Sequence, residues 1–215
     1  DPELRKKMIY DIENGIHGWD NFVEFAGLDQ IFVTSVRSKK NEDAVGLSLI
    51  ELGKLRGKDP YNATFDLLEE EENAVGMVDF YGTEEHVQTF MRLPEMNVCT
   101  DGLLGGKPHP RVYGAFPRVL GKYVREDKTL TLEEAVYKMT KKPASTFNIK
   151  DRGEIKEDLL ADICIFDKDT IIDKGTFTEP MQYPEGIAYV IINGEVVVDH
   201  GNHTGNRPGR VIRRK

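Results

Sequence analysis

The feature that most constrains the fold is the order of two strand-like runs and the helical pattern between them. Val75–Tyr81 is an apolar, β-rich run with the length of a buried strand, and Met96–Asp101 has the same character. Between them, Thr83 is placed to cap an amphipathic helix. Because parallel strands need such a helical crossover, this order predicts an α/β fold with a parallel sheet or a (β/α) barrel.

Helix signals recur on both sides of this unit. Residues 2–14 have a helical apolar pattern. The segments Ser48–Glu51 and Thr131–Glu134 each have the spacing of a capping box, in which a hydroxyl and a carboxylate three residues apart cap a helix start. Asp59–Pro60 combines an N-cap residue with a first-turn proline, which predicts another start. Pro143 is expected to end or kink the helix that begins at the second capping box.

Further strand-like runs divide the chain into two regions. They share a β-branched and aromatic composition and are Trp19–Phe25, Gln30–Val36, Ala161–Asp167, Ile187–Ile192 and Glu195–Val198. Asn193–Gly194, between the last two runs, is a strong hairpin signal. The motifs that could carry chemistry precede residue 145, and β character dominates after it. We therefore expect one domain over residues 1–145 and a second over residues 146–215.

The acidic composition argues against a nucleic-acid partner. The chain has 37 Asp and Glu against 29 Lys and Arg and a net charge of -8, which repels phosphate backbones. No apolar run approaches the roughly 18 residues of a membrane span. Cys99 and Cys164 lie far apart instead of forming a disulfide framework, and the first residues have no signal-peptide pattern. These features favour a cytoplasmic protein.

Asp101 stands at the end of a predicted strand and directly before Gly102, where α/β folds and barrels place catalytic groups. An aspartate at such a place is more often a turn former or a helix cap, so position alone leaves both interpretations open. Cys99 shares the strand face with Asp101 and is expected to lie deeper, as a small buried residue. A reactive or metal-bound thiolate at Cys99 is an alternative that would require a nearby cation.

The string Thr100–Tyr123, TDGLLGGKPHPRVYGAFPRVLGKY, resembles the signature of the N-acyl-D-amino-acid deacylases, a family of the metal-dependent amidohydrolase superfamily. This family usually has serine where the chain has Thr100, a change that keeps the hydroxyl. The resemblance extends over nearly the whole chain, through Gly46–Leu49, Lys138–Thr140, Arg152–Glu157, Ala161–Asp162, Gln182–Gly186, Val190–Val197 and Gly205–Arg210.

The resemblance implies an architecture. Residues 1–145 would form the C-terminal part of a (β/α)8 amidohydrolase barrel with a helical insertion, and residues 146–215 part of a small β-sandwich. In the family, strands from the beginning of the protein complete this sandwich, so strand edges are expected to lie unpaired in this chain. The expected partners are the missing N-terminal part of the enzyme or a self-associating copy, besides a small-molecule N-acyl amino acid substrate.

The resemblance also implies a function, the hydrolysis of N-acyl-D-amino acids by metal-activated water. Asp101 matches the family aspartate that binds the metal and serves as the general base, which later returns the proton to the leaving amine. Arg111 matches the arginine expected to bind the substrate carboxylate, a task that suits a planar bidentate donor. A surface arginine bound to loop carbonyls is the alternative, because the loop is about one residue shorter than usual. His109 is expected to order this loop and not to bind metal.

Zinc is the expected cofactor, although the chain lacks most of its ligands. A hydrolytic zinc site normally uses three protein ligands. The chain has five histidines and no His-x-His pair, and His200 and His203 lie in a glycine-rich loop without an obvious third ligand. The other ligands are expected upstream of this chain, so the segment alone is expected to be inactive.

Two alternative functions stay open. The same scaffold would also suit another cyclic amide or a dipeptide, and a contact of Arg111 with a free carboxylate would favour the deacylase. The chain would instead be a non-catalytic binding or assembly module if Asp101 turned into the core.

Overall fold

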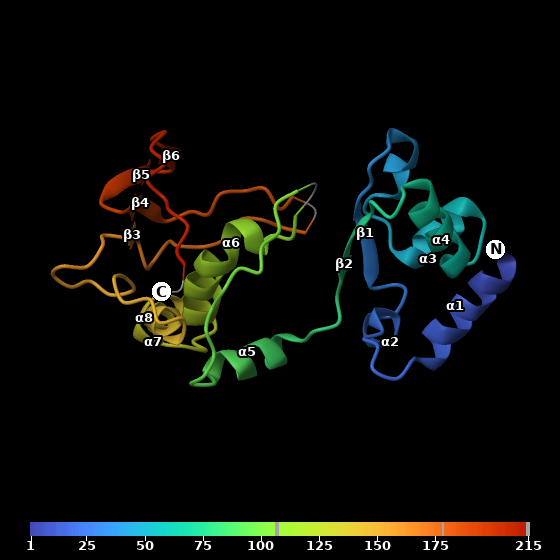
Figure 1. Ribbon diagram of the computed structural model, residues 1–215, viewed down its shortest axis with the longest axis horizontal. Coiled ribbons are helices and arrows are strands. Elements are labelled where there is room, and N and C mark those ends of the chain that lie inside the picture. Colours follow the sequence, from blue (N-terminus) through green and yellow to red (C-terminus); the bar gives the residue numbers. More distant parts are fainter. Residues whose placement is uncertain (106–107, 178, 214–215) are drawn as a thin grey trace. The chain divides into compact units, whose positions relative to one another are not determined.

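The computed structural model describes residues 1–105, 108–177 and 179–213 and divides the chain into two compact units (Figure 1). The first comprises Asp1–Thr83 with Gly105 and Pro108, and the second comprises Glu84–Leu104 with the residues from His109 onward. The predicted boundary at residue 145, between a barrel part and a sandwich part, stays a prediction. None of the described helices is both long and apolar enough to cross a bilayer.

The first unit combines helices with a two-stranded sheet. Its strands lie where Gln30–Val36 and Val75–Tyr81 predicted them, and they pair antiparallel, with Ile31 opposite Asp79. Its core consists of Val33, Ala44, Leu52, Ala63 and Leu67. Its elements are α1 (Pro2–Asn14), α2 (Phe22–Ala26), β1 (Ile31–Ser35), η1 (Lys39–Ala44), α3 (Leu49–Arg56), α4 (Pro60–Glu70) and β2 (Gly76–Asp79).

Side-chain caps explain where the helices of this unit begin. The helix predicted over residues 2–14 is confirmed as α1. The predicted capping box at α3 is also present, since Ser48 Oγ accepts from the Glu51 amide at 3.3 Å and Glu51 Oε2 accepts from the Ser48 amide at 2.8 Å. At α4, the Asp59 carboxylate accepts from the Asn62 amide at 3.0 Å, so this predicted start is confirmed as well.

The strand predicted over Trp19–Phe25 is wrong, because Asn21 begins a helix there. Its side-chain oxygen accepts hydrogen bonds from the amides of Val23 at 3.1 Å and Glu24 at 3.4 Å. Its side-chain nitrogen donates to the carbonyl of Ile12 at 2.6 Å, and only 3% of the residue is exposed. Asparagine is a strong N-cap, and here the cap overrides the strand preference of the neighbouring aromatic residues.

The second unit joins several helices to an antiparallel sheet with the strand order β3-β4-β5-β6. The predicted strand Ala161–Asp167 is confirmed as β3, and the predicted hairpin links β4 to β5 through Asn193 and Gly194, with φ of 49° and 83° as in a type I′ turn. Its elements are α5 (Glu84–Arg92), α6 (Arg111–Arg118), the π-helix η2 (Val119–Glu126), α7 (Leu132–Met139), α8 (Lys141–Thr146), β3 (Ile163–Phe166), β4 (Ile187–Ile192), β5 (Glu195–Asp199) and β6 (Asn202–His203).

Two prolines interrupt the helices of the second unit. Pro117 lies inside α6, two residues before the π-helix begins at Val119, and its missing N–H removes an α-helical hydrogen bond. The predicted capping box at Thr131 begins α7, which ends at Met139, four residues before Pro143. A proline ring clashes with the carbonyl four residues earlier, so the predicted interruption by Pro143 is confirmed.

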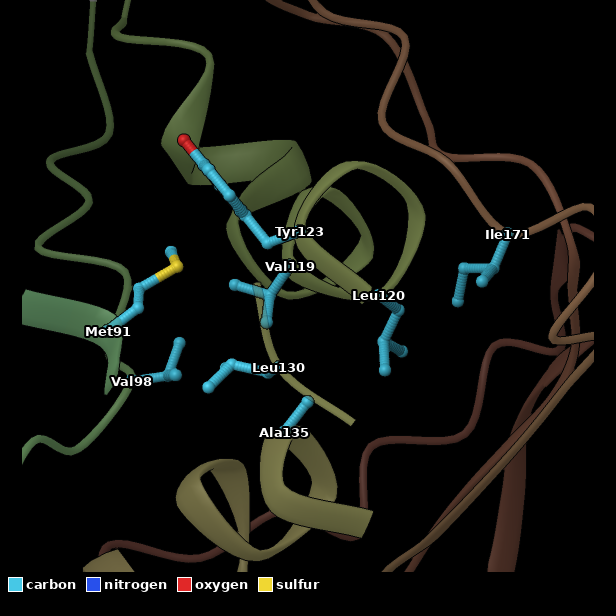
Figure 2. Packing of buried hydrophobic residues seen from close by; sticks show 8 residues of the cluster. All are labelled: Met91, Val98, Val119, Leu120, Tyr123, Leu130, Ala135 and Ile171. Atoms are coloured by element: carbon cyan, nitrogen blue, oxygen red, sulfur yellow. The ribbon is translucent and has the colours of Figure 1, made fainter. Parts of the chain in front are cut away.

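The hydrophobic core of the second unit surrounds η2. Figure 2 shows side chains of η2 directed toward residues from α5, α7 and the segments beside them. The buried residues are Met91, Val98, Val119, Leu120, Tyr123, Leu130, Ala135 and Ile171. This core fixes α6 and η2 within the unit, and α6 carries one of the predicted site residues at its first position.

Residues 171–173 pack closely against the α6–η2 helix at two glycines. A Cβ on Gly114 would lie 2.6 Å from Cβ of Asp173, and a Cβ on Gly121 would lie 2.7 Å from the carbonyl oxygen of Ile171. The two glycines are seven residues apart and so share one helix face. Side chains larger than hydrogen would push this segment away from the helix.

The strand predicted over Met96–Asp101 is wrong for this chain, and the predicted parallel β-α-β unit does not form among the described residues. β2 pairs antiparallel with β1, and no described strand lies beside residues 96–101. A strand needs a neighbour to satisfy its backbone groups, and the described residues supply none here. The outer edge of β3 likewise has no partner strand among the described residues.

Candidate active site

Asp101 and Arg111 contact each other at the start of α6. Arg111 Nη2 lies 2.7 Å from Asp101 Oδ2, and Arg111 Nε donates a hydrogen bond to the carbonyl oxygen of Asp101 at 2.8 Å. The side chain of Asp101 is 77% exposed and that of Arg111 is 40% exposed. Asp101 is therefore not turned into the core, which disfavours the assembly-module alternative. The two predicted site residues, Asp101 and Arg111, therefore lie together at the protein surface.

Gly102 allows the Asp101 loop to approach α6 closely. A Cβ at this position would lie 3.2 Å from Cα of Val112, in the first turn of the helix. The Gly102 amide also donates to the hydroxyl of Thr100 at 3.3 Å, so the threonine hydroxyl orders the same loop. The loop thus lies against the turn that carries Arg111.

The side chain of His109 contacts the first turn of α6. Its Nδ1 accepts a hydrogen bond from the Arg111 amide at 3.0 Å, and its ring lies edge-on to Phe177 with 5.0 Å between centroids. Burial lowers the pKa of His109, the positive charges of Arg111 and Arg118 lower it further, and Asp101 opposes them. The neutral imidazole that results keeps Nδ1 free to accept.

An ion pair that sequence reasoning missed lies along the same helix. Arg118 Nη1 lies 3.2 Å from Oδ2 of Asp173, whose side chain is only 9% exposed. Seven residues separate Arg118 from Arg111, so both lie on one face of α6. This spacing is visible in the sequence, but Asp173 lies 55 residues from Arg118, and nothing in the sequence announces their pairing.

A second polar group joins η2 to α5. The hydroxyl of Tyr123 donates to Glu84 Oε2 at 3.1 Å, and Lys122 Nζ lies 2.9 Å from the same oxygen. Burial raises the pKa of Tyr123, and the carboxylate of Glu84 raises it further. Tyr123 therefore stays protonated and serves as a hydrogen-bond donor within the core.

The remaining predicted candidates lie away from this place or make local contacts. Cys99 was expected to be buried and is exposed, because residues 96–101 are not a strand inside a barrel here. His200 Nδ1 lies 2.7 Å from Asp199 Oδ1, and its ring packs on Tyr189, so it acts locally in its turn. Within the described part of the chain, no three His, Cys, Asp or Glu side chains are grouped to hold a metal.

The comparison with known families includes both proposed site residues. Residues 96–198 match the Amidohydrolase family. The chain is 37% identical to N-acyl-D-glutamate deacylase of Alcaligenes xylosoxydans xylosoxydans over 188 residues, which cover 87% of this chain and 37% of that protein. It is also 37% identical to D-aminoacylase of the same organism over 170 residues, covering 79% of this chain and 34% of that one.

Solved structures agree. The crystal structure of N-acyl-D-glutamate deacylase from Bordetella bronchiseptica, complexed with zinc and a phosphonate inhibitor, matches with a TM-score of 0.77 and 35% identity over 86% of this chain and 38% of that one. A D-aminoacylase structure solved to study its binuclear metal center matches with a TM-score of 0.79 and 30% identity over 98% of this chain and 46% of that one. Residues 96–198 of the chain belong to the Amidohydrolase family.

The chain spans about two fifths of the length of the relatives it matches. The family assignment agrees with the predicted α/β class and with the resemblance found in the sequence. The N-acyl-D-glutamate deacylase crystallised with zinc is larger than this chain.

Proposed function

We propose that the protein containing this chain hydrolyses the amide bond of N-acyl-D-amino acids, and that Asp101 and Arg111 belong to its active site. The observation that carries the proposal is their contact, at 2.7 Å, within the segment that matches the Amidohydrolase family. Similarity to N-acyl-D-glutamate deacylase, D-aminoacylase and N-acyl-D-aspartate deacylase supports the substrate class.

Arg111 binds the carboxylate of the substrate in this proposal. Its guanidinium is partly exposed and already holds one carboxylate oxygen, that of Asp101. Arginine has five N–H donors in a planar fork, so donors remain for a ligand carboxylate on the exposed side. This contact fixes the amino-acid part of the substrate beside Asp101.

Asp101 moves the proton. In amide hydrolysis, the oxygen of water bonds to the acyl carbon, the C–N bond breaks, and the proton that water loses must reach the departing nitrogen. A carboxylate beside the bound substrate can accept this proton and return it to the amine. The exposure of Asp101 leaves its side chain open to a substrate and a water molecule.

A divalent metal, zinc by analogy with the N-acyl-D-glutamate deacylase structure, would make water more acidic. The described residues do not fit such an ion by themselves, because Asp101 belongs to no group of three His, Cys, Asp or Glu side chains among them. We propose that Asp101 supplies one ligand and that residues outside this chain supply the others.

We also propose how the two parts of the chain contribute to a barrel and a sandwich. We propose that residues 1–145 form the C-terminal part of a (β/α)8 barrel with a helical insertion and that residues 146–215 form part of a β-sandwich. The unpaired segment 96–101 and the open edge of β3 support this arrangement, because both would gain neighbours in a complete sheet. The missing N-terminal part of the enzyme, or a second copy, would supply those neighbours.

Another amidohydrolase reaction is the second candidate. The chain is 35% identical to the dihydroorotase of Lactobacillus acidophilus over 98 residues, or 40% of this chain. At similar identity, the N-acyl-D-glutamate deacylase covers 87% of the chain. The longer match favours the deacylase.

The proposal is tested by assaying the whole protein and the 215-residue chain separately, each with zinc. Release of free amine is followed with N-acetyl-D-leucine, N-acetyl-D-glutamate and their L-enantiomers, and dihydroorotate is the comparison substrate. We expect the whole protein to cleave a D-substrate in preference to its enantiomer, and the chain alone to be inactive. Cleavage of dihydroorotate alone would favour the second candidate and contradict the first.

A further inference from the structure

We propose that His109 is a positioning residue for Arg111, which holds the first turn of α6 so that the guanidinium stays beside Asp101. The inference rests on the proposed deacylase function, because it assigns a support to the residue that binds the substrate carboxylate. His109 itself touches neither the substrate nor the reacting atoms in this proposal.

The start of α6 explains why a support is needed. The first amides of a helix have no partner within the helix, and the N-cap residue Pro110 has no side chain that could accept from them. His109 supplies two acceptors for these amides. Its Nδ1 accepts from the Arg111 amide at 3.0 Å, and its carbonyl oxygen accepts from the Val112 amide at 3.1 Å.

The imidazole of His109 is held in place by Phe177, and Gly175 lies close by at the start of α6. Phe177 meets the ring nearly perpendicularly, at 86°, with 5.0 Å between centroids. Nearby, a Cβ on Gly175 would lie 3.5 Å from Cβ of Pro110, so the same segment also lies against the N-cap residue. The ring is therefore fixed from one side by packing and from the other by the Arg111 amide.

Arg111 links the His109 contact to the position of its guanidinium beside Asp101. Its backbone amide is bound to His109, while its side chain contacts the carboxylate of Asp101 at 2.7 Å and the carbonyl oxygen of Asp101 at 2.8 Å. Both ends of the residue are thus restrained. Loss of the His109 contact frees the amide end, and the side chain then leaves its place beside Asp101 more often.

Three substitutions separate the acceptor from mere bulk. In His109→Asn, the side-chain oxygen can occupy the place of Nδ1 and accept from Arg111, whereas His109→Ala removes the acceptor. His109→Gln places its polar atoms near Nε2 instead, so it serves as a control of similar size. All three variants are compared for folding by circular dichroism before use.

The kinetic test uses the whole protein with zinc and N-acetyl-D-leucine. For His109→Ala and His109→Gln we expect KM to rise by about 3- to 10-fold, the effect of one lost hydrogen bond, with kcat changed less. For His109→Asn we expect KM within about 2-fold of the wild type. Equal impairment of the Asn and Ala variants, or an unchanged KM in both, would overturn the assignment.

A second readout does not depend on activity. In the ¹⁵N-labelled 215-residue chain, the Nε–H signal of Arg111 is identified by its loss in Arg111→Lys. Because this group donates to the Asp101 carbonyl, we expect its exchange with water to be slow in the wild type and His109→Asn, and faster in His109→Ala. An unchanged exchange rate in His109→Ala would refute the positioning role, even if the whole protein proves to have another substrate.

Discussion

The guanidinium of Arg111 contacts Asp101 at two points, the carboxylate oxygen Oδ2 at 2.7 Å and the backbone carbonyl oxygen at 2.8 Å. Arg111 follows Asp101 by ten positions in the sequence, and Gly102 lies against Val112 in the first turn of α6. One contact thus fixes both the proposed proton carrier and the proposed carboxylate-binding group. The two roles remain separable, because each side chain can be changed alone.

Replacing Arg111 by lysine should weaken substrate binding more than it slows the reaction. Lysine keeps the charge but loses the planar fork that can hold two carboxylates. In the whole protein, Arg111→Lys should lower kcat/KM by about 10- to 100-fold, mainly through KM. Steady-state kinetics with N-acetyl-D-leucine measures this, with Arg92→Lys on α5 as the matched control. A loss confined to kcat would contradict the binding role.

Glu71 is predicted to stabilise the first unit in a pH-dependent way. Its buried carboxylate accepts from the amides of Arg37 at 2.7 Å and Ser38 at 2.8 Å and from Asn41 Nδ2 at 2.6 Å. Hydrogen bonds, first from the Ser38 hydroxyl and then from Asn41, lower its pKa to about 2, although burial opposes them. Its contribution should be fully present above pH 4.5 and lost as the pH falls toward 2.

This pH dependence is measured as the urea midpoint for unfolding of the first unit, with hydrogen exchange of its amides as the probe. Glu71→Gln should be less stable than the wild type at pH 7, and the difference should shrink as the pH falls from 4.5 toward 2. Glu42→Gln, at an exposed position in η1, is the control and should show no such trend. A difference that is constant with pH would show that the charge of Glu71 does not stabilise the unit.

Leu67 should contribute strongly to the stability of the same unit. It is 1% exposed and packs in the core with Val33 and Leu52. Leu67→Ala should lower the free energy of unfolding by about 2 to 5 kcal/mol, because a cavity remains where the side chain was. Leu55→Ala, at a 51% exposed position in α3, should cost less than about 1 kcal/mol. Equal effects of the two substitutions in urea unfolding would contradict the assigned core.

Local signals in the sequence predicted the parts of the fold that depend on local interactions. The capping boxes at Ser48 and Thr131 and the hairpin at Asn193 each involve atoms a few residues apart, so the printed sequence contains the whole interaction. Asn21 was missed because the aromatic residues around it suggested a strand. The N-cap preference of asparagine was the competing signal.

Features that need distant partners could not be predicted in this way. Met96–Asp101 has a strand composition, but a strand forms only beside a neighbour, and none of the described segments is one. The site itself was partly predicted: the resemblance named Asp101 and Arg111, and the structure brings them together. The pairing of Arg118 with Asp173 could not be predicted, because it depends on how the segment at Asp173 packs on α6.

The most direct test of the account is the Asp101→Asn substitution in the whole protein loaded with zinc. Asparagine has nearly the same shape but cannot accept a proton, so kcat for N-acetyl-D-leucine should fall by about 100- to 10,000-fold. The Arg92→Lys control should keep wild-type activity. If Asp101→Asn retains a kcat close to that of the wild type, then this carboxylate does not carry the proton, and the proposed active site is wrong.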